Sequence, residues 1–301
     1  MGARPPGFAD ANAPAEGAEF GILGVPYDAT SSFRSGSRAA PNAVRDASWN
    51  FETYLLSHDV DLTDIPIHDW GNIEDFARPE DMQGAVKEAV TAILIQGSFP
   101  VVIGGEHSLS PAVVSALKGA GAGGVGGFGI IVLDAHMDFR DQYLNIPQSH
   151  ACATRRMGEL AGFESIVPIG VRSVSREEMD EINDDMRGRF RFITADDVRQ
   201  NGMTVSVNKA LGLVGRDRIF LSLDIDCIDP AFAPGTGTPE PFGLTALDVR
   251  EAIRILAPRL VGFDIVEIAP NYDNGNTAAL GARLIREVIA AVHAARRKPI
   301  G

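Results

Sequence analysis

Short apolar runs alternate along the chain with longer segments in which apolar residues recur at helical spacing. The runs predict strands at residues 20–25, 101–103, 130–133, 166–171, 219–225 and 260–267. The helical segments are residues 79–96, 110–118, 175–186, 245–256 and 277–297. Strands that alternate with helices form a parallel sheet that is covered on both faces. The pattern therefore predicts an α/β fold, with a single three-layer α/β/α domain around a central, mostly parallel sheet.

The boundaries of the helices and of the domain have signals of their own. Thr245 is suited to cap the helix that it begins, and Asp248 supports that start. Gly97 is suited to end the first long helix. No linker, repeat or block of charge divides the chain, so we expect one catalytic domain over residues 19–301. Residues 1–18 are rich in Ala, Gly and Pro and lack the features of a signal peptide, so we expect a loose N-terminal tail.

A glycine-rich segment at residues 119–129 contains the spacing G-x-G-x-x-G, at Gly119, Gly121 and Gly124. In a dinucleotide-binding fingerprint this spacing follows a strand and opens a helix. Here it follows a predicted helix and precedes a predicted strand, so the order is reversed. We interpret the segment as a flexible surface loop.

Polar side chains gather where the predicted strands end. After the run at 130–133, Asp134, His136 and Asp138 occupy every second position, so an extended backbone would point all three the same way. Taken alone, the trio could equally be a turn at the end of a strand. Three other strands also run into polar residues, which are His107, Asp224, Asp226 and Glu267. Ligands of open parallel sheets bind at the carboxyl ends of the strands, so these segments predict one site.

Carboxylates that crowd together need cations to compensate their charge. Two histidines and four aspartates suit two divalent ions that share bridging carboxylates. Ligands that are mainly oxygen, with some imidazole, favour Mn²⁺ over Zn²⁺, and the chain has no pair of cysteines to favour zinc. The D-x-D at Asp224 and Asp226 could instead belong to a calcium loop, but the glycine and the distant glutamate of an EF-hand are missing.

Charge and cysteine content narrow the class of partner. Against 27 Lys and Arg stand 40 Asp and Glu, which gives a formal charge of −13. Such a balance argues against nucleic acid and anionic membranes and mildly favours a small cationic substrate. No apolar run approaches the roughly 18 residues of a membrane span. With only Cys152 and Cys227, the chain has no disulfide framework, so we expect a cytoplasmic protein.

The motifs together resemble the ureohydrolase family of arginases and agmatinases over nearly the whole chain. The matching motifs are G-G-E-H-S at 104–108, D-A-H-x-D at 134–138, S-H-A at 149–151, S-x-D-I-D-x-x-D-P at 222–230 and G-T-G-T-P-E-P at 235–241. The chain departs from the family at Glu106, where relatives often carry Asp, and at Ala151, where many carry Gly. The resemblance implies an arginase-like fold with about eight strands, and a homo-oligomer, either a trimer or a hexamer.

The resemblance also implies a ligand set for two Mn²⁺ ions per chain. One ion would be held by His107, Asp134, Asp138 and Asp224, and the other by Asp134, His136, Asp224 and Asp226. Asp134 and Asp224 would then bridge the pair. Two such ions share a water and make it hydroxide at neutral pH, and this hydroxide would attack the carbon of a guanidinium group to release urea and an amine.

Three residues are candidates for catalytic roles, and only Asp138 among them is also a predicted metal ligand. His150 would shuttle protons, although it could also be a satisfied loop histidine. Glu267 would pair with the N–H fork of the guanidinium group, or else form a structural ion pair. Asp138 counts as both ligand and catalytic residue. Cys152 and Cys227 have no base or oxyanion site in the sequence, so we expect them to be buried or uninvolved.

The substrate is predicted from motifs that differ within the family. The G-T-G-T-P-E-P run and the turn at Pro270 to Asp273 look more like agmatinases than arginases. Residues 138–150 also lack the Asn and Ser pattern by which arginases hold an α-carboxylate and α-amine. We therefore predict hydrolysis of agmatine to putrescine and urea, in polyamine biosynthesis. Aminopropylagmatine, guanidinobutyrate and arginine remain as alternatives, followed by a metal-dependent deacetylase of the same fold and a polyamine sensor.

Overall fold

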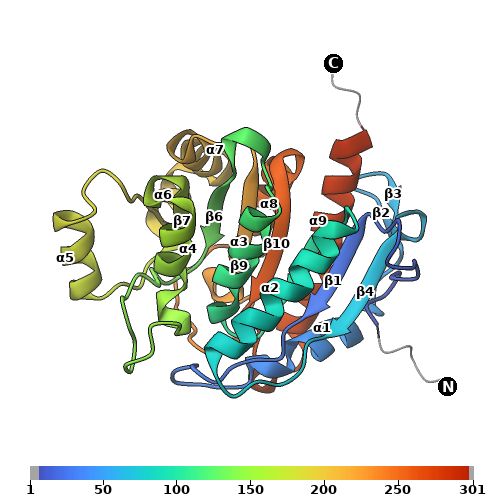
Figure 1. Ribbon diagram of the computed structural model, residues 1–301, viewed down its shortest axis with the longest axis horizontal. Helices are drawn as coiled ribbons and strands as arrows, with labels where there is room; N and C mark the ends of the chain where they lie inside the picture. Colours follow the sequence, from blue (N-terminus) through green and yellow to red (C-terminus); the bar gives the residue numbers. More distant parts are fainter. Residues whose placement is uncertain (1–6, 298–301) are drawn as a thin grey trace.

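The computed structural model describes residues 7–297, which form a sheet of eight strands between two layers of helices (Figure 1). The strands are β1 (Phe20–Gly24), β4 (Ile67–Asn72), β5 (Phe99–Ile103), β6 (Gly129–Leu133), β7 (Ile166–Val171), β8 (Ile193–Thr194), β9 (Ile219–Asp224) and β10 (Leu260–Val266). Their order is β4-β1-β5-β10-β9-β6-β7-β8, and each pairing is parallel. The predicted α/β fold with about eight strands is confirmed.

Helices cover both faces of the sheet. The helices are α1 (Ala40–Ser48), α2 (Pro79–Ile95), α3 (Ser110–Gly119), α4 (Ala153–Ala161), α5 (Arg176–Asp184), α6 (Ala195–Asn201), α7 (Met203–Val214), α8 (Ala246–Leu256) and α9 (Asn276–Arg297). In Figure 1, α2, α3 and α4 lie side by side in front of the sheet, and α5 lies apart at the left. On the other face, α1 packs against α9, α9 against α8, and α8 against α7. A short hairpin of β2 (Tyr54–Leu55) and β3 (Val60–Asp61) lies outside the main sheet.

The continuous apolar runs of the central strands are explained by this sandwich. In β6, Ile131 and Leu133 belong to the core under α7, α8 and α9, whereas Ile130 and Val132 belong to the core under α2, α3 and α4. All four side chains are fully buried. A strand covered on both faces is apolar at nearly every position, because successive side chains point to opposite sides.

The predicted boundaries agree closely with the observed ones. Thr245 caps α8 in a reciprocal arrangement: its hydroxyl accepts from the Asp248 N–H at 3.1 Å, and the Asp248 carboxylate accepts from the Thr245 N–H at 2.8 Å.

The apolar pattern missed four helices and two strands of the main sheet, which are α1, α4, α6, α7, β4 and β8. Both missed strands are at the edges of the sheet, where one side of the strand has no neighbour and the apolar pattern is weaker.

Two predicted loops have different outcomes. The glycine-rich segment connects α3 to β6 and is largely exposed, as expected of a surface loop. Residues 7–18 have no regular helix or strand, but Phe8 is buried in the core, and its N–H donates to Asp69 Oδ2 at 2.7 Å. The predicted tail is therefore packed at Phe8, whereas residues 10–17 are partly or fully exposed. Residues 1–6 lie outside the described part, and the domain boundary at residue 18 stays a prediction.

The strand order brings the polar segments together. His107, Asp134 and Glu267 lie in the loops after β5, β6 and β10, and Asp224 is the last residue of β9. Strands β5, β10, β9 and β6 are consecutive neighbours in the sheet. Because all four strands are parallel, these residues lie at the same edge of the sheet. Among the described residues, no helix is long and apolar enough to cross a membrane.

Candidate metal centre

The backbone after β6 stays extended and then turns sharply. His136 forms a parallel bridge with Ser173, so the extended geometry continues two residues past Asp134. Asp138 then adopts a φ of +49°, in the left-handed region. Aspartate tolerates this region better than most residues. The two interpretations of the trio are therefore both partly right, since a strand extension is followed by a turn.

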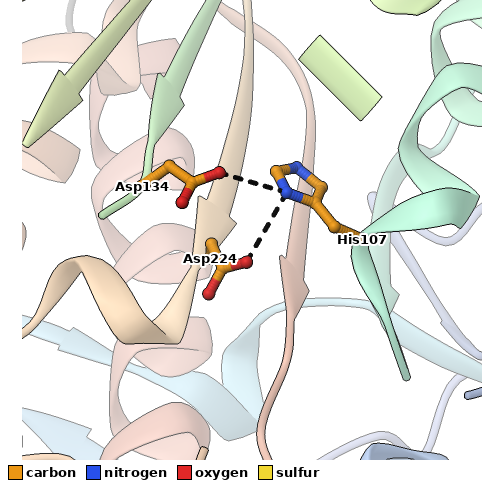
Figure 2. Close-up of side chains that lie close together, drawn as sticks. All are labelled: His107, Asp134 and Asp224. Atoms are coloured by element: carbon orange, nitrogen blue, oxygen red, sulfur yellow. Dashed lines mark ion pairs between the residues drawn. The ribbon is translucent and has the colours of Figure 1, made fainter. Parts of the chain in front are cut away.

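His107 faces three carboxylates at the centre of the sheet edge. Its Nδ1 lies 3.2 Å from Asp134 Oδ2, 3.1 Å from Asp138 Oδ2 and 3.5 Å from Asp224 Oδ2. Figure 2 shows His107 pointing at Asp134 and Asp224, which come from the ends of β6 and β9. The ligand-type atoms of His107, Asp134 and Asp224 lie within 4.8 Å of one another, as a metal ion requires.

A second cluster of the same kind shares Asp134 with the first. The Nδ1 of His136 lies 3.0 Å from Asp226 Oδ2 and 3.7 Å from Asp134 Oδ1. The ligand-type atoms of Asp134, His136 and Asp226 again lie within 4.8 Å of one another. All six predicted ligands are thus brought together. Asp134 belongs to both clusters, whereas Asp224, the second predicted bridge, belongs to the first cluster only.

Hydrogen bonds from the backbone fix one oxygen of Asp134, Asp224 and Asp226, and the other oxygen of each faces an imidazole. Asp134 Oδ1 accepts from the His136 N–H at 2.7 Å, and Asp224 Oδ1 accepts from the Asp226 N–H at 2.9 Å. Asp226 Oδ1 accepts from the Ala135 N–H at 3.2 Å. Asp134 Oδ2 and His107 Nδ1 are buried without a hydrogen-bond partner. Buried polar atoms of this kind are costly unless a further group, such as a cation, satisfies them.

The titration of the cluster reflects its excess of negative charge. Burial, with Asp138 second, raises the pKa of Asp134 to about 7. Burial and the Asp226 carboxylate raise the pKa of Asp224 well above its usual range. Burial opposes the charged form of His136, but Asp226 outweighs it and raises the pKa of His136 to about 10. The cluster therefore favours added positive charge, which a divalent cation supplies.

Two buried residues behind His107 were missed by the sequence analysis. The Nε2 of His107 lies 3.1 Å from Ser222 Oγ, whose hydroxyl donates to Asp264 Oδ1 at 2.6 Å. Ser222 and Asp264 are fully buried in β9 and β10. The ring of His107 is thus held so that Nδ1 faces the carboxylates. An aspartate inside the apolar run of β10 was the available signal.

A cavity of about 280 Å³ opens beside the clusters. Its lining includes five carboxylate residues, which are Asp138, Glu178, Asp224, Asp226 and Glu267, and it also includes His136 and His150. Arg140 lines the same cavity, with its guanidinium 4.0 Å from Glu178 and 3.9 Å from Glu177. The cavity is therefore acidic on balance, with one cation paired to carboxylates on its wall.

Glu267 lies at the end of β10 in a constrained position. Its φ is +63°, and its N–H donates to the Gly105 carbonyl at 2.7 Å. Its Oε1 accepts from the His107 N–H at 2.7 Å. Burial, with Glu106 second, raises the pKa of Glu267 well above its usual range. Among the described residues, Glu267 forms no ion pair with a basic side chain, so the alternative of a structural ion pair gains no support.

Arg172 and Thr238, neither of which was predicted from the sequence to have a role, connect the neighbouring loops to the clusters. The guanidinium of Arg172 donates to five backbone carbonyls, which are those of Gly170, Asp226, Cys227, Glu240 and Pro241. Thr238 Oγ1 donates to Asp226 Oδ2 at 3.0 Å. The G-T-G-T-P-E-P motif thus supplies a hydroxyl to the second cluster and is fastened by Arg172.

The two cysteines are buried, as predicted. Burial, with Asp138 second, raises the pKa of the Cys152 thiol to about 11. Burial also raises the pKa of Cys227 well above its usual range. A nucleophilic cysteine needs a lowered pKa, so neither thiol is suited to that role.

Comparison with known proteins identifies the family of the chain. The model of the Arginase family matches residues 18–291. The N(1)-aminopropylagmatine ureohydrolase of Thermococcus kodakarensis is 36% identical over 282 residues, and the match covers 92% of each chain. The agmatinase of Bacillus subtilis is 34% identical over 281 residues, with 89% of this chain and 90% of that chain covered.

A solved structure has the same fold along almost the whole chain. The crystal structure of the agmatine ureohydrolase of Thermoplasma volcanium superposes with a TM-score of 0.92 at 39% sequence identity, covering 99% of this chain and 98% of that chain. The family match, the relatives and the fold all agree. The chain belongs to the arginase family and is a ureohydrolase, a hydrolase that cleaves amidines.

Proposed function

We propose that the protein hydrolyses agmatine to putrescine and urea with two Mn²⁺ ions. The observation that carries this proposal is the pair of His–Asp clusters that share Asp134 beside an acidic cavity. Relatives named agmatinase and aminopropylagmatine ureohydrolase support the choice of a guanidino substrate with a cationic tail. The direct test is an assay for urea and putrescine from agmatine, with the full-length protein loaded with Mn²⁺. Formation of both products in equal amounts is expected.

The side chains fit two divalent ions. One would be held by His107, Asp134, Asp138 and Asp224, and the other by Asp134, His136, Asp224 and Asp226. Mainly oxygen donors with one imidazole per ion favour Mn²⁺ over softer ions. When bound, such a pair polarises water and makes it a stronger nucleophile at neutral pH.

The reaction adds water across one C–N bond of the substrate. The oxygen of water bonds to the guanidinium carbon, and the bond from that carbon to the alkylated nitrogen breaks. That nitrogen needs a proton to leave as an amine, and His150 at the cavity wall is the group we assign to deliver it. Asp138 lies 3.1 Å from His107 and also lines the cavity. We therefore assign it a catalytic role in addition to its role as a metal ligand.

Glu267 is assigned to bind the guanidinium group. It lines the cavity, and one of its oxygens is fixed by the His107 N–H. A carboxylate and a guanidinium group match each other as a fork of two parallel hydrogen bonds. Binding a cation also stabilises the charged form of Glu267, whose pKa burial raises.

Replacing Glu267 with glutamine tests this assignment. The substitution keeps the shape but removes the charge, and a charge-assisted hydrogen bond contributes about 1.5–3 kcal/mol. We expect kcat/KM on agmatine to fall at least about tenfold, with metal content unchanged. Glu164→Gln, at an exposed position, is the matched control and should keep full efficiency. An unchanged kcat/KM for Glu267→Gln would remove Glu267 from the substrate site.

Arg140 supports a second candidate substrate. A guanidino acid such as 4-guanidinobutyrate carries a carboxylate where agmatine carries an ammonium group. Arg140 is the one arginine that lines the cavity, among the described residues, and it could pair with that carboxylate. Its neighbours Glu177 and Glu178 compete for the same guanidinium group, so we place agmatine first.

We also propose a homo-oligomer, a trimer or a hexamer, on the basis of family resemblance. Light scattering coupled to size-exclusion chromatography would measure the mass in solution. A mass close to that of one chain, 32.1 kDa, would contradict this part of the proposal.

A further inference from the structure

The imidazole of His150 is surrounded by hydroxyl groups. Its Nδ1 lies 3.4 Å from Thr30 Oγ1 and 3.2 Å from Ser149 Oγ, and its Nε2 lies 3.2 Å from Ser32 Oγ. The ring of Tyr143 packs edge-on against it, with centroids 5.9 Å apart. His150 and Ser32 both line the cavity. The hydroxyls around the ring therefore decide which nitrogen carries the proton in neutral imidazole.

Thr30 is fixed in turn by Glu106, one of the two positions at which the chain departs from the family motifs. The carboxylate of Glu106 is fully buried. It accepts from the Thr30 N–H at 2.8 Å and from the Thr30 hydroxyl at 2.5 Å. It also accepts from the hydroxyls of Ser31 at 3.2 Å and of Ser108 at 2.6 Å. The three donors from Thr30 and Ser31 thus hold the loop at Thr30 to the loop that carries Glu106 and His107.

The hydrogen of the Thr30 hydroxyl is therefore committed. A threonine hydroxyl has one hydrogen to donate and two lone pairs that accept. The hydrogen goes to Glu106, because a carboxylate only accepts. One lone pair accepts from the His150 backbone N–H at 3.1 Å, and the other faces His150 Nδ1. Ser149 and Ser32 lack such a constraint, because their hydroxyls can rotate to suit either form of the ring.

We propose that Thr30, fixed by Glu106, is a positioning residue that holds the proton of neutral His150 on Nδ1. Nδ1–H then donates to Thr30, and the lone pair of Nε2 points to Ser32 and the cavity. Nε2 is thereby the atom that takes up and delivers protons at the substrate. The inference rests on the proposed function, because it deepens the role assigned there to His150.

Replacing Thr30 with valine or with serine separates the hydroxyl from the rest of the side chain. Valine has nearly the same shape but cannot accept from His150, whereas serine keeps the hydroxyl. By analogy with the partners that orient metal-ligating histidines, we expect Thr30→Val to lower kcat about 10–100-fold. KM and Mn²⁺ content should stay within about twofold, and Thr30→Ser should recover most of the kcat. A loss of the same size in both variants would overturn the proposal.

A double-mutant cycle with His150→Ala distinguishes positioning from a general structural effect. If Thr30 acts through His150, Thr30→Val should lower kcat no further once His150 is alanine. A full additional loss in the double variant would contradict the proposal. If His150→Ala alone has normal turnover, the proposed role of His150 fails first. If His150→Ala is impaired while Thr30→Val is not, only the inference about Thr30 fails.

A spectroscopic measurement reads the proton position directly. In the metal-free full-length protein labelled with ¹⁵N-histidine, the signals of His150 can be assigned by their loss in His150→Ala. Under conditions where this ring is neutral, we expect Nδ1 to give the protonated type of ¹⁵N shift and Nε2 the unprotonated type. The opposite pattern would overturn the proposal.

Discussion

Replacing His150 with alanine is expected to lower turnover on agmatine by roughly 10²–10⁴-fold, the range typical of general acid–base catalysis. The departing amine cannot leave without a proton, and His150 is a histidine at the cavity wall that the described structure leaves outside both carboxylate clusters. The Mn²⁺ content and the free energy of unfolding should change little, because His150 holds no ligand position. Steady-state kinetics with metal analysis of the same samples measures both.

A second histidine provides the control. His68 is the second residue of the edge strand β4, and its Nδ1 hydrogen-bonds to the Ala13 carbonyl at 2.8 Å. It neither belongs to a carboxylate cluster nor lines the cavity, among the described residues. His68→Ala should therefore retain turnover even if it loses some stability. Turnover near that of the unmodified protein in His150→Ala would mean that His150 is a loop histidine, one of the two interpretations that the sequence allowed.

The largest effect of substrate structure is expected between agmatine and arginine. We predict that kcat/KM for agmatine exceeds that for arginine by at least about a hundredfold, or roughly 2.7 kcal/mol. Arginine adds a carboxylate to agmatine, and an acidic cavity repels it and must desolvate it. Arg140 does not remove this penalty, because Glu177 and Glu178 already face its guanidinium group.

Urea release measured on a panel of guanidino compounds tests this selectivity. The panel should contain agmatine, arginine, 4-guanidinobutyrate and aminopropylagmatine at matched concentrations. Equal rates on agmatine and arginine would contradict the assigned substrate. A clear preference for 4-guanidinobutyrate would instead indicate that Arg140 binds the carboxylate of the substrate, and Arg140→Ala should then abolish that preference.

The fold could be predicted where burial on both faces of the sheet leaves a continuous apolar run in the sequence. Strands such as β6 and β9 are apolar at nearly every position, and helices such as α8 carry a complete cap at Thr245. The edge strands β4 and β8 escaped, because β4 is half-buried along most of its length and β8 has only two residues. Helix α1 escaped because Val44 is its only large apolar residue.

The candidate site could be predicted where acidic residues and histidines directly follow an apolar strand. The spacing of Asp134, His136 and Asp138 predicted a shared site without deciding against a turn, and the strand order explains why Asp134 and Asp138 meet His107. Residues that act through others give no such signal, because a hydroxyl such as that of Ser222 or Thr30 is common everywhere. Only the folded chain shows that Ser222 touches His107 and that Thr30 touches His150.

The number of Mn²⁺ ions bound per chain at full activity tests the central claim most directly. Metal-free protein would be titrated with Mn²⁺, freed of excess metal, and measured for both bound metal and urea release from agmatine. Two clusters that share Asp134 predict close to two ions per chain, with full activity reached only as the second ion binds. A stoichiometry of one under saturating Mn²⁺, with full activity, would contradict the account.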